Sequence, residues 1–180
     1  MRVVGGRLGG QRLVAPRGRA TRPTPERVRE ALFSILGSVE GERVLDLFAG
    51  SGALGIEALS RGASEATLVD SSAAAVVAIR RNLESLGLAA EVQRRGVLPF
   101  LQWAVGAGRQ YDLVFVDPPY RHASALAREL PTALAPVLAP DARVVVESDR
   151  RMPLQLGPLT LTDERRYGDT LIRIYVNGSR

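Results

Sequence analysis

The chain has 180 residues, of which 46% are hydrophobic and 24% charged, a balance typical of one folded globular domain and not of a disordered chain. It contains no cysteine and one histidine, which excludes disulfides, cysteine nucleophiles and metal sites built on cysteine or on several histidines. No apolar run is long enough to cross a bilayer and the first residues lack the apolar stretch of a signal peptide, so we expect a cytoplasmic protein with no membrane partner and no metal.

The net charge of +5 comes from the start of the chain. All 24 basic residues are arginines, and residues 1–30 hold eight of them against two glutamates, whereas the other 150 residues hold sixteen arginines against seventeen acids. Arginine binds phosphate through two parallel hydrogen bonds and stacks on bases, so the segment is a candidate nucleic-acid contact, with a solvated basic tail as the alternative. The candidate contacts are Arg2, Arg7, Arg12, Arg17, Arg19 and Arg22.

The first elements are predicted around a run of glycines. Short apolar pairs at 3–4 and 13–14 flank four glycines, which predicts a small β-hairpin with a flexible tip, and residues 16–23 are expected to form an extended linker. We therefore expect an arginine-rich N-terminal extension over residues 1–22 and a catalytic domain over residues 23–180.

A first helix is predicted after this linker. Thr24 is the expected N-cap with Pro25 at the first helical position, apolar residues recur from position 28 to 36 on one face, and a glycine then ends the helix. Arg27 and Arg29 fall outside the apolar face, so both are expected to stay in solvent.

From residue 43 onward, apolar strands alternate with helices. Strands are predicted over 43–48, 66–69, 91–94, 111–116 and 142–147, helices over 53–60, 73–86, 97–105 and 124–138, and a closing hairpin over 159–165 and 170–176. Pro131 and Pro136 are expected to break the last helix. Alternating strand–helix units predict an α/β fold in which helices cover both faces of a mostly parallel sheet, and the hairpin adds an antiparallel edge.

The most informative motif is a glycine loop between the first predicted strand and its helix. Gly50, Gly52 and Gly55 form G-x-G-x-x-G, a spacing that allows a tight turn and a close approach of the backbone to a ligand. Asp70 ends the next strand, 20 residues after Gly50, where its carboxylate can bind both hydroxyls of a ribose. This pattern alone leaves a nicotinamide dinucleotide open as one alternative.

Asp46 favours a different cofactor. A carboxylate close to the loop would repel a pyrophosphate, which prefers bare helix N–H groups, but it suits a ligand with an amino group and a positive sulfonium. S-adenosylmethionine has both and carries no phosphate, so we expect Asp46 to face its methionyl ammonium while N–H groups of the loop bind its carboxylate. In the alternative interpretation, Asp46 only caps a turn.

The adenine contact departs from the usual pattern. In folds that bind S-adenosylmethionine, an acidic residue after the third strand often binds the adenine amine, whereas this chain has a glycine there, so adenine would rest on backbone groups and on apolar side chains such as Leu98. The expected cofactor contacts are Asp46, Phe48, Gly50, Ser51, Gly52, Asp70, Ser71, Gly96 and Val97.

The sequence DPPY at 117–120 follows an apolar strand and predicts the catalytic loop, which two adjacent prolines make stiff. The exocyclic amine of a base is a poor nucleophile because its lone pair is delocalised into the ring. The Asp117 carboxylate and the Pro118 carbonyl could bind this amine, aim its lone pair at the methyl group and stabilise the developing positive charge. Pro119 stiffens the loop, and Tyr120 would stack on the extruded base. The alternative is a rigid turn that only ends a strand.

Together these motifs resemble a known family. The glycine-loop segment 44–63, the DPPY sequence, RVVGGRLGGQRL at 2–13, TRPTPERVREALF at 21–33 and ERRYGDTLIRIY at 164–175 are similar to the RsmD family of bacterial 16S ribosomal RNA guanine-N2 methyltransferases over nearly the whole chain. The resemblance implies a Rossmann-like, S-adenosylmethionine-dependent enzyme that methylates the exocyclic amine of guanine(966) in the small ribosomal subunit. It also implies that Gly50, Gly52 and Asp70 hold the cofactor, that residues 117–120 receive the base and that the arginine-rich start contacts RNA. Gly96 departs from the aspartate common in relatives.

Other functions remain open from the sequence. A DNA adenine-N6 methyltransferase uses the same D/N-PP-Y chemistry, but such enzymes usually need an added domain to read sequence, for which 180 residues leave almost no room. A catalytically inactive RNA-binding assembly factor would have no reason to keep the glycine loop, its acidic neighbours and DPPY together. A dehydrogenase requires DPPY to be coincidental. We expect a monomeric RNA methyltransferase that acts on the small ribosomal subunit.

Overall fold

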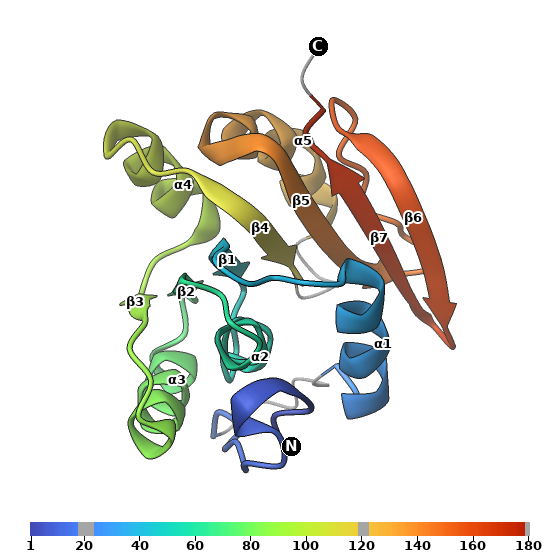
Figure 1. Ribbon diagram of the computed structural model, residues 1–180. Coiled ribbons are helices and arrows are strands. Elements are labelled where there is room, and N and C mark those ends of the chain that lie inside the picture. The colour runs from blue at the N-terminus through green and yellow to red at the C-terminus, as the bar shows by residue number, and fades with distance from the viewer. Residues whose placement is uncertain (18–23, 119–122, 179–180) are drawn as a thin grey trace.

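The computed structural model describes residues 1–17, 24–118 and 123–178 (Figure 1). In chain order the elements are η1 (Gly6–Leu8), α1 (Glu26–Leu36), β1 (Arg43–Leu47), α2 (Ala53–Ser60), β2 (Glu65–Val69), α3 (Ala73–Leu86), β3 (Glu91–Gln93), α4 (Val97–Gly106), β4 (Tyr111–Val116), α5 (Ala123–Leu134), η3 (Ala135–Val137), β5 (Leu138–Asp149), β6 (Thr160–Tyr167) and β7 (Thr170–Val176). The bounds of α2, α3, β4 and β7 coincide with the predicted ones, because clear helix stops or unbroken apolar runs mark them in the sequence.

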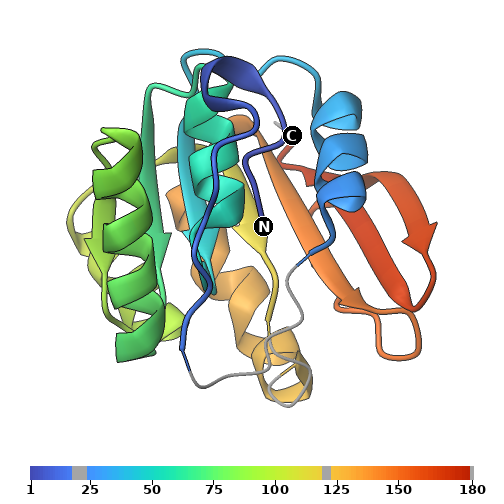
Figure 2. The same ribbon diagram turned by 90° about the horizontal axis from the view of Figure 1, so that it is seen from below.

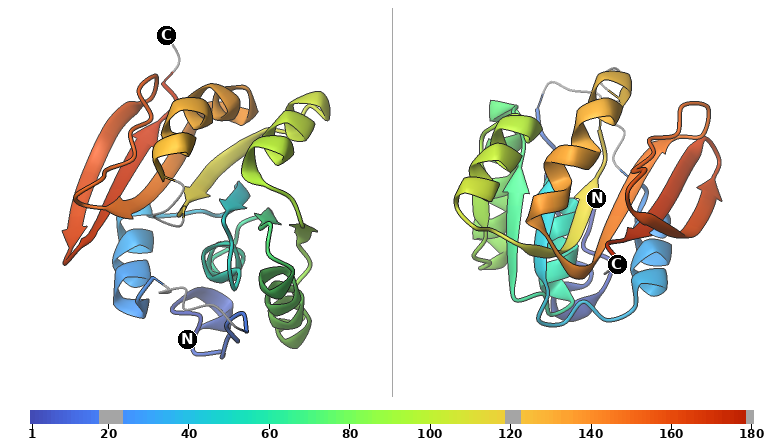
Figure 3. Two further views of the ribbon diagram at one scale, coloured as in Figure 1. Left: turned by 180° about the vertical axis from the view of Figure 1, so that it is seen from behind. Right: turned by 90° about the horizontal axis from the view of Figure 1, so that it is seen from above.

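The strands form one sheet in the order β3-β2-β1-β4-β5-β7-β6 (Figures 1 and 3). β1 to β5 pair in parallel, whereas β7 pairs antiparallel with both β5 and β6. The predicted α/β fold with an antiparallel closing hairpin is therefore confirmed. The order reverses between β1 and β4, and ligands of open α/β sheets bind at the carboxyl ends of the strands beside such a reversal.

Helices cover both faces of the sheet, with α1, α2 and α3 on one face and α4 and α5 on the other (Figure 1). Side chains alternate along β1: Leu45 and Leu47 pack in the core beneath α4 and α5, whereas Val44 packs beneath α1 and α2. Asp46 follows the same alternation. Its side chain therefore points to the face that α2 covers, and α2 is the helix that follows the glycine loop.

The N-terminal segment is less regular than the predicted hairpin. Its two arms, within the described residues, meet at one isolated antiparallel bridge between Arg2 and Arg12, and η1 lies between them. Val3 and Leu13 are buried in a cluster with side chains of α2 and α3, and Figure 2 shows the segment lying across α2. The N–H groups of Val3 and Leu13 donate across the two arms, to the carbonyls of Gln11 and Met1. Those of Val4 and Gly5 donate to Glu57 of α2 instead, so the pairing of the arms stops there.

Two predictions for the start of α1 are wrong. Pro25 is the N-cap, and the Thr24 hydroxyl donates to Oε2 of Glu147 in β5 over 2.8 Å instead of capping the helix. Arg29 is 1% exposed, and its Nη2 donates to the backbone carbonyl of Arg2. The apolar pattern of α1 identifies only the face that packs on the sheet, whereas the N-terminal segment buries Arg29 from another side.

The second half of the chain differs from prediction mainly in its bounds. α5 contains Pro131 and ends before Pro136, which lies in η3, so only the second proline marks the break. β5 starts earlier and ends later than predicted. No helix among the described residues is long and apolar enough to cross a membrane.

Candidate active site

The predicted site residues lie along the carboxyl edge of the parallel strands. Leu47, the last residue of β1, pairs with the last residues of β2 and β4. Asp70 and Asp117 follow β2 and β4 directly, so they flank the segment that leaves β1. The structure thus brings the glycine loop and the start of the DPPY sequence to one place, as the sequence predicts.

Asp46 is a buried carboxylate with an exposure of 2%. Its Oδ2 accepts a hydrogen bond of 3.0 Å from the Gly55 N–H, in the first turn of α2. Burial, with a smaller contribution from the charge of Asp70, raises the pKa of Asp46 to about 7 against the lowering effect of the Gly55 hydrogen bond. No basic side chain of the described residues forms an ion pair with Asp46. The site therefore offers a dehydrated carboxylate to a cationic ligand group.

The glycine loop needs left-handed backbone at several positions. Gly50 and Gly52 have φ values of 59° and 79°, and Gly52 is the N-cap of α2. Phe48 also has a positive φ of 65°, which is costly for a residue with a Cβ and is typical of functional loops. A Cβ at Gly55 would overlap Cδ2 of Leu68 in β2, so this third glycine allows α2 to pack closely on the sheet.

Asp70 connects two cofactor-loop segments. Its Oδ2 accepts from the Gly50 N–H over 3.0 Å, and its Oδ1 accepts from the Ser72 N–H over 2.8 Å. Each carboxylate oxygen has a second lone pair, so both can still accept a hydroxyl hydrogen. Ser71, next in the chain, is exposed at the same edge.

The segment after β3 also leaves the sheet at the carboxyl edge of the parallel strands. Gly96 is exposed and is the N-cap of α4, whereas Val97 is buried. A Cβ at Gly96 would meet the nearest atom, Cδ of Pro99, at 3.5 Å, an ordinary contact distance. A Cβ therefore fits at this position without rearrangement.

Asp117 lies beside a second acidic residue on the neighbouring strand. Val116 of β4 pairs with Val146 of β5, which puts Asp117 and Glu147 at the same level. Burial, together with the charges of Glu147 and Asp46, raises the pKa of Asp117 well above its ordinary value. Pro118 is buried, whereas the predicted catalytic residues Pro119 and Tyr120 lie outside the described residues.

The arginines of the predicted RNA contact are exposed where the structure describes them. These are Arg2, Arg7, Arg12 and Arg17, whereas Arg19 and Arg22 lie outside the described residues. Arg2 forms an exposed ion pair of 3.3 Å with Glu26. Arg2 and Arg12 line a hollow of about 480 Å³ on the outer side of the N-terminal segment.

Sequence reasoning missed a set of buried polar residues that hold the N-terminal segment. Arg29, Glu57, Ser60 and Asn82 are each at most 3% exposed. Glu57 is the one charged residue of α2, and Asn82 lies among the apolar positions of α3. A polar residue on an apolar helix face is a usable signal, but the N-terminal partners of Glu57 and Asn82 lie more than 50 residues away in the chain.

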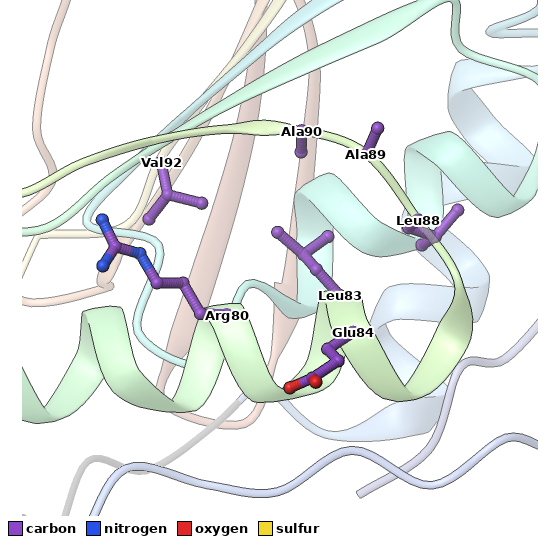
Figure 4. A pocket seen from close by; sticks show the side chains of 7 residues that line it. All are labelled: Arg80, Leu83, Glu84, Leu88, Ala89, Ala90 and Val92. Carbon is purple, nitrogen blue, oxygen red and sulfur yellow. The ribbon is translucent and has the colours of Figure 1, made fainter.

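A groove of about 440 Å³ lies elsewhere, between α3 and the segment that leads into β3 (Figure 4). Its lining residues are Arg80, Leu83, Glu84, Leu88, Ala89, Ala90 and Val92. None of the predicted cofactor or catalytic residues lines it. Figure 4 shows Leu83 pointing from α3 into the groove, with Arg80 beside Val92 at one end. Among the described residues, no group of three or more His, Cys, Asp or Glu side chains could hold a metal ion.

Comparisons with known proteins agree with this geometry. Residues 1–176 match the family described as Conserved hypothetical protein 95. The chain is 38% identical to Ribosomal RNA small subunit methyltransferase D of Escherichia coli K12 over 97% of this chain and 89% of that protein. It is 33% identical to the protein of the same name from Haemophilus influenzae, over 98% and 94%.

Solved structures show the same similarity. Escherichia coli yhhF, described provisionally as a methyltransferase, has a TM-score of 0.86 and 35% identity over 100% of this chain and 99% of that one. A hypothetical protein from Thermus thermophilus has a TM-score of 0.84 and 34% identity over 97% and 98%. A more distant protein, described provisionally as a methyltransferase and complexed with SAH, shares the fold at 18% identity and a TM-score of 0.72 over 84% of this chain and 48% of that one.

Proposed function

The chain belongs to the RsmD family, whose description is Conserved hypothetical protein 95, and from this premise we propose that it methylates the N2 amine of a guanine in 16S ribosomal RNA of the small subunit. The methyl donor in this proposal is S-adenosylmethionine, and the protein acts in the cytoplasm, where ribosomes are assembled. In this proposal the protein acts as a monomer.

The observation that carries this proposal is the buried carboxylate of Asp46, which forms no ion pair with any residue that the structure describes, beside a glycine loop and a short distance along the sheet edge from Asp117. A dinucleotide pyrophosphate would add negative charge next to Asp46, whereas the ammonium and sulfonium of S-adenosylmethionine supply the missing cation. Asp70 would bind the ribose hydroxyls. Gly96 and Val97 would contact the adenine. Phe48, Ser51 and Ser71 would contact other parts of S-adenosylmethionine.

S-adenosylmethionine supplies a methyl group on a positive sulfur and leaves as a neutral thioether. Asp117 and the Pro118 carbonyl would accept the two hydrogens of the guanine amine, which holds the nitrogen lone pair in line with the methyl group. The amine must lose one proton after transfer. Asp117 suits this step because burial beside Glu147 raises its pKa, so its carboxylate binds a proton more readily than an exposed one. Tyr120 would stack on the base.

The arginine-rich start would bind RNA phosphates. Arg2, Arg7, Arg12 and Arg17 are exposed, and the segment that carries them is fixed on α2, close to the glycine loop. In this proposal Arg19 and Arg22, which lie outside the described residues, also bind RNA.

A methyl-transfer experiment tests the proposed function. Labelled S-adenosylmethionine is incubated with unmethylated small subunits, naked 16S ribosomal RNA and duplex DNA, and the label is traced to a nucleoside. We expect N2-methylguanosine from the ribosomal substrates. Label only in adenine of DNA would establish the competing DNA methyltransferase, and no label in any substrate would favour an RNA-binding assembly factor.

Asp117→Ala tests the assigned role of that residue. We expect transfer to be lost while S-adenosylhomocysteine still binds with near wild-type affinity. Asp112→Asn is the matched control, because Asp112 lies at the start of β4 and bonds Arg43 at the opposite edge of the sheet. Turnover retained by Asp117→Ala would refute the role.

A further inference from the structure

The N-terminal segment is held on α2 by buried polar side chains. The Glu57 carboxylate, which is 0% exposed, accepts hydrogen bonds of 2.7 Å from the N–H groups of Val4 and Gly5. The Ser60 hydroxyl donates to the Gly5 carbonyl over 2.6 Å and accepts from the Leu8 N–H over 3.0 Å. These bonds fix residues 4–8 on the helix that follows the glycine loop.

Close approach at two glycines makes this docking specific. Gly6 has a φ of +72°, and a Cβ there would overlap the carbonyl oxygen of Ser60. A Cβ at Gly5 would overlap the guanidinium of Arg61. At Gly6 the backbone of the segment therefore lies directly on α2, with no room for a side chain between them, whereas at Gly5 the flexible Arg61 side chain can move aside.

Asn82 of α3 holds the other end of the segment. It is 1% exposed, its Oδ1 accepts from the Val14 N–H over 2.8 Å, and its Nδ2 donates to the Val14 carbonyl over 3.0 Å. The same Nδ2 donates to the Ser51 carbonyl over 2.9 Å. Both amide hydrogens and the amide oxygen are thus used, and one side chain joins residue 14 to residue 51.

The two residues that Asn82 joins belong to different parts of the proposed site. Ser51 lies between Gly50 and Gly52 in the glycine loop, where the backbone would meet the cofactor. Val14 lies three residues before the exposed Arg17, on the segment proposed to bind RNA. Breaking the Asn82 bonds would leave the Ser51 carbonyl, in a buried contact, and the partly buried N–H and carbonyl of Val14 without these partners, so the loop and residue 14 hold their positions together.

We propose that Asn82 is a positioning residue that couples occupancy of the glycine loop to the docking of residues 1–14, and hence to RNA binding. The proposal rests on the proposed function of the loop and the arginine-rich segment. A cofactor that fixes the Ser51 peptide favours the docked position of Val14. By thermodynamic reciprocity, RNA that binds the docked segment favours cofactor binding by the same factor.

Hydrogen exchange measures this coupling without RNA or catalysis. The probe is the Val14 amide, followed by mass spectrometry with and without saturating S-adenosylhomocysteine. In the wild-type protein we expect the ligand to slow exchange at Val14 by about fivefold or more, the lower end of typical coupling factors. Unchanged exchange in a wild-type protein that binds the ligand would overturn the proposal, whatever the variants do.

Two variants assign the coupling to Asn82. Asn82→Ala removes all three bonds. Asn82→Asp keeps the acceptor for the Val14 N–H but loses both donated bonds, to the carbonyls of Val14 and Ser51. In both we expect the ligand effect at Val14 to disappear. Ser60→Ala is the matched control, because Ser60 also holds the segment but does not touch the glycine loop, so it should speed exchange at Leu8 and keep the ligand effect at Val14.

RNA binding gives the reciprocal measurement. We expect S-adenosylhomocysteine to tighten binding of a 16S ribosomal RNA fragment by the same factor in wild type and in Ser60→Ala, but not in Asn82→Ala. Equal tightening in Asn82→Ala would refute the role of Asn82 while the proposed methylation stands. Absence of ligand binding and of methyl transfer in wild type would instead refute the proposed function itself.

Discussion

The buried carboxylate of Asp46 should make cofactor binding depend on pH. Burial raises its pKa to about 7 in the free protein. An ammonium group bound beside it favours the ionised form and returns the pKa toward the ordinary value of 3.8. Ligand binding must then release the proton that Asp46 carries at low pH, so affinity falls as pH falls below about 7.

The size of this effect follows from the two pKa values. With a pKa of about 7 in the free protein and an ordinary value in the complex, affinity at about pH 6 is roughly tenfold weaker than at about pH 8, and at about pH 5 it is roughly a hundredfold weaker. Close to one proton is released per ligand at about pH 6. The α-amino group of S-adenosylhomocysteine stays protonated over this range and contributes no slope.

Titration calorimetry with S-adenosylhomocysteine tests the reasoning. Affinity is measured across this pH range, and proton release is obtained by repeating the titration in buffers of different ionisation enthalpy. Asp46→Asn should lose the pH dependence and bind more weakly at about pH 8. Asp112→Asn, at the opposite edge of the sheet, should keep the wild-type profile. A wild-type affinity that stays flat from about pH 5 to 8 would refute the reasoning.

The same substitution has a consequence for stability. The pKa of Asp46 is higher in the folded state than in the unfolded state, so the free protein is progressively destabilised as pH rises from about 4 to 7. Asp46→Asn removes the ionisable group and with it this loss of stability. We expect it to raise the free energy of unfolding at about pH 8 by up to about 4 kcal/mol, the upper limit set by the pKa difference. Urea denaturation of the ligand-free protein at about pH 4 and 8 gives the comparison.

Three further predictions concern packing and charge. Gly55→Ala should lower the free energy of unfolding, measured by urea denaturation, by about 1–3 kcal/mol and weaken S-adenosylhomocysteine binding, because its Cβ overlaps Leu68. Gly106→Ala, which has open space around it, should be neutral or stabilising. Equal effects of the two substitutions would contradict the packing role of Gly55. Glu57→Gln should lower the free energy of unfolding by roughly 2–4 kcal/mol and make the chain cleavable by trypsin at Arg7, since two backbone N–H groups lose their charged acceptor. An N-terminal segment as resistant to trypsin as in the wild-type protein would argue against the role of Glu57 in holding it. Replacing Arg7, Arg12 and Arg17 together by alanine should reduce the slope of the logarithm of the RNA-binding constant against the logarithm of the salt concentration by about 2–3, if each arginine contacts one phosphate. Arg109→Ala, at the opposite sheet edge, should leave this slope unchanged.

The glycine loop and the acidic residues around it could be predicted because their geometry is local. A strand, a turn that needs left-handed glycines and a helix follow one another within about twenty residues, and the parallel order brings the loops after β1, β2 and β4 to one edge. Gly50, Gly52, Asp70 and Asp117 therefore lie where the sequence predicts them.

The errors at the start of the chain have a common cause. The apolar face of α1 shows which side meets the sheet, but it carries no information about a second neighbour on another side. The N-terminal segment is that neighbour, and it buries Arg29. In the same way the Thr24 hydroxyl bonds Glu147, a residue 123 positions away, in preference to the helix that follows it.

The sequence by itself determined the α/β fold, the bounds of its most regular elements and the motifs at the sheet edge, because periodicity, glycine turns and apolar runs act over short stretches of chain. Only the tertiary structure decided how the arginine-rich start is attached. Its +6 charge indicated affinity for acids, but the buried bonds from Glu57, Ser60 and Asn82 cross 52 to 68 residues and make residues 1–14 part of the surface beside the glycine loop. Hydrogen bonds of this kind depend on which helices the fold places side by side, and no local pattern encodes that arrangement.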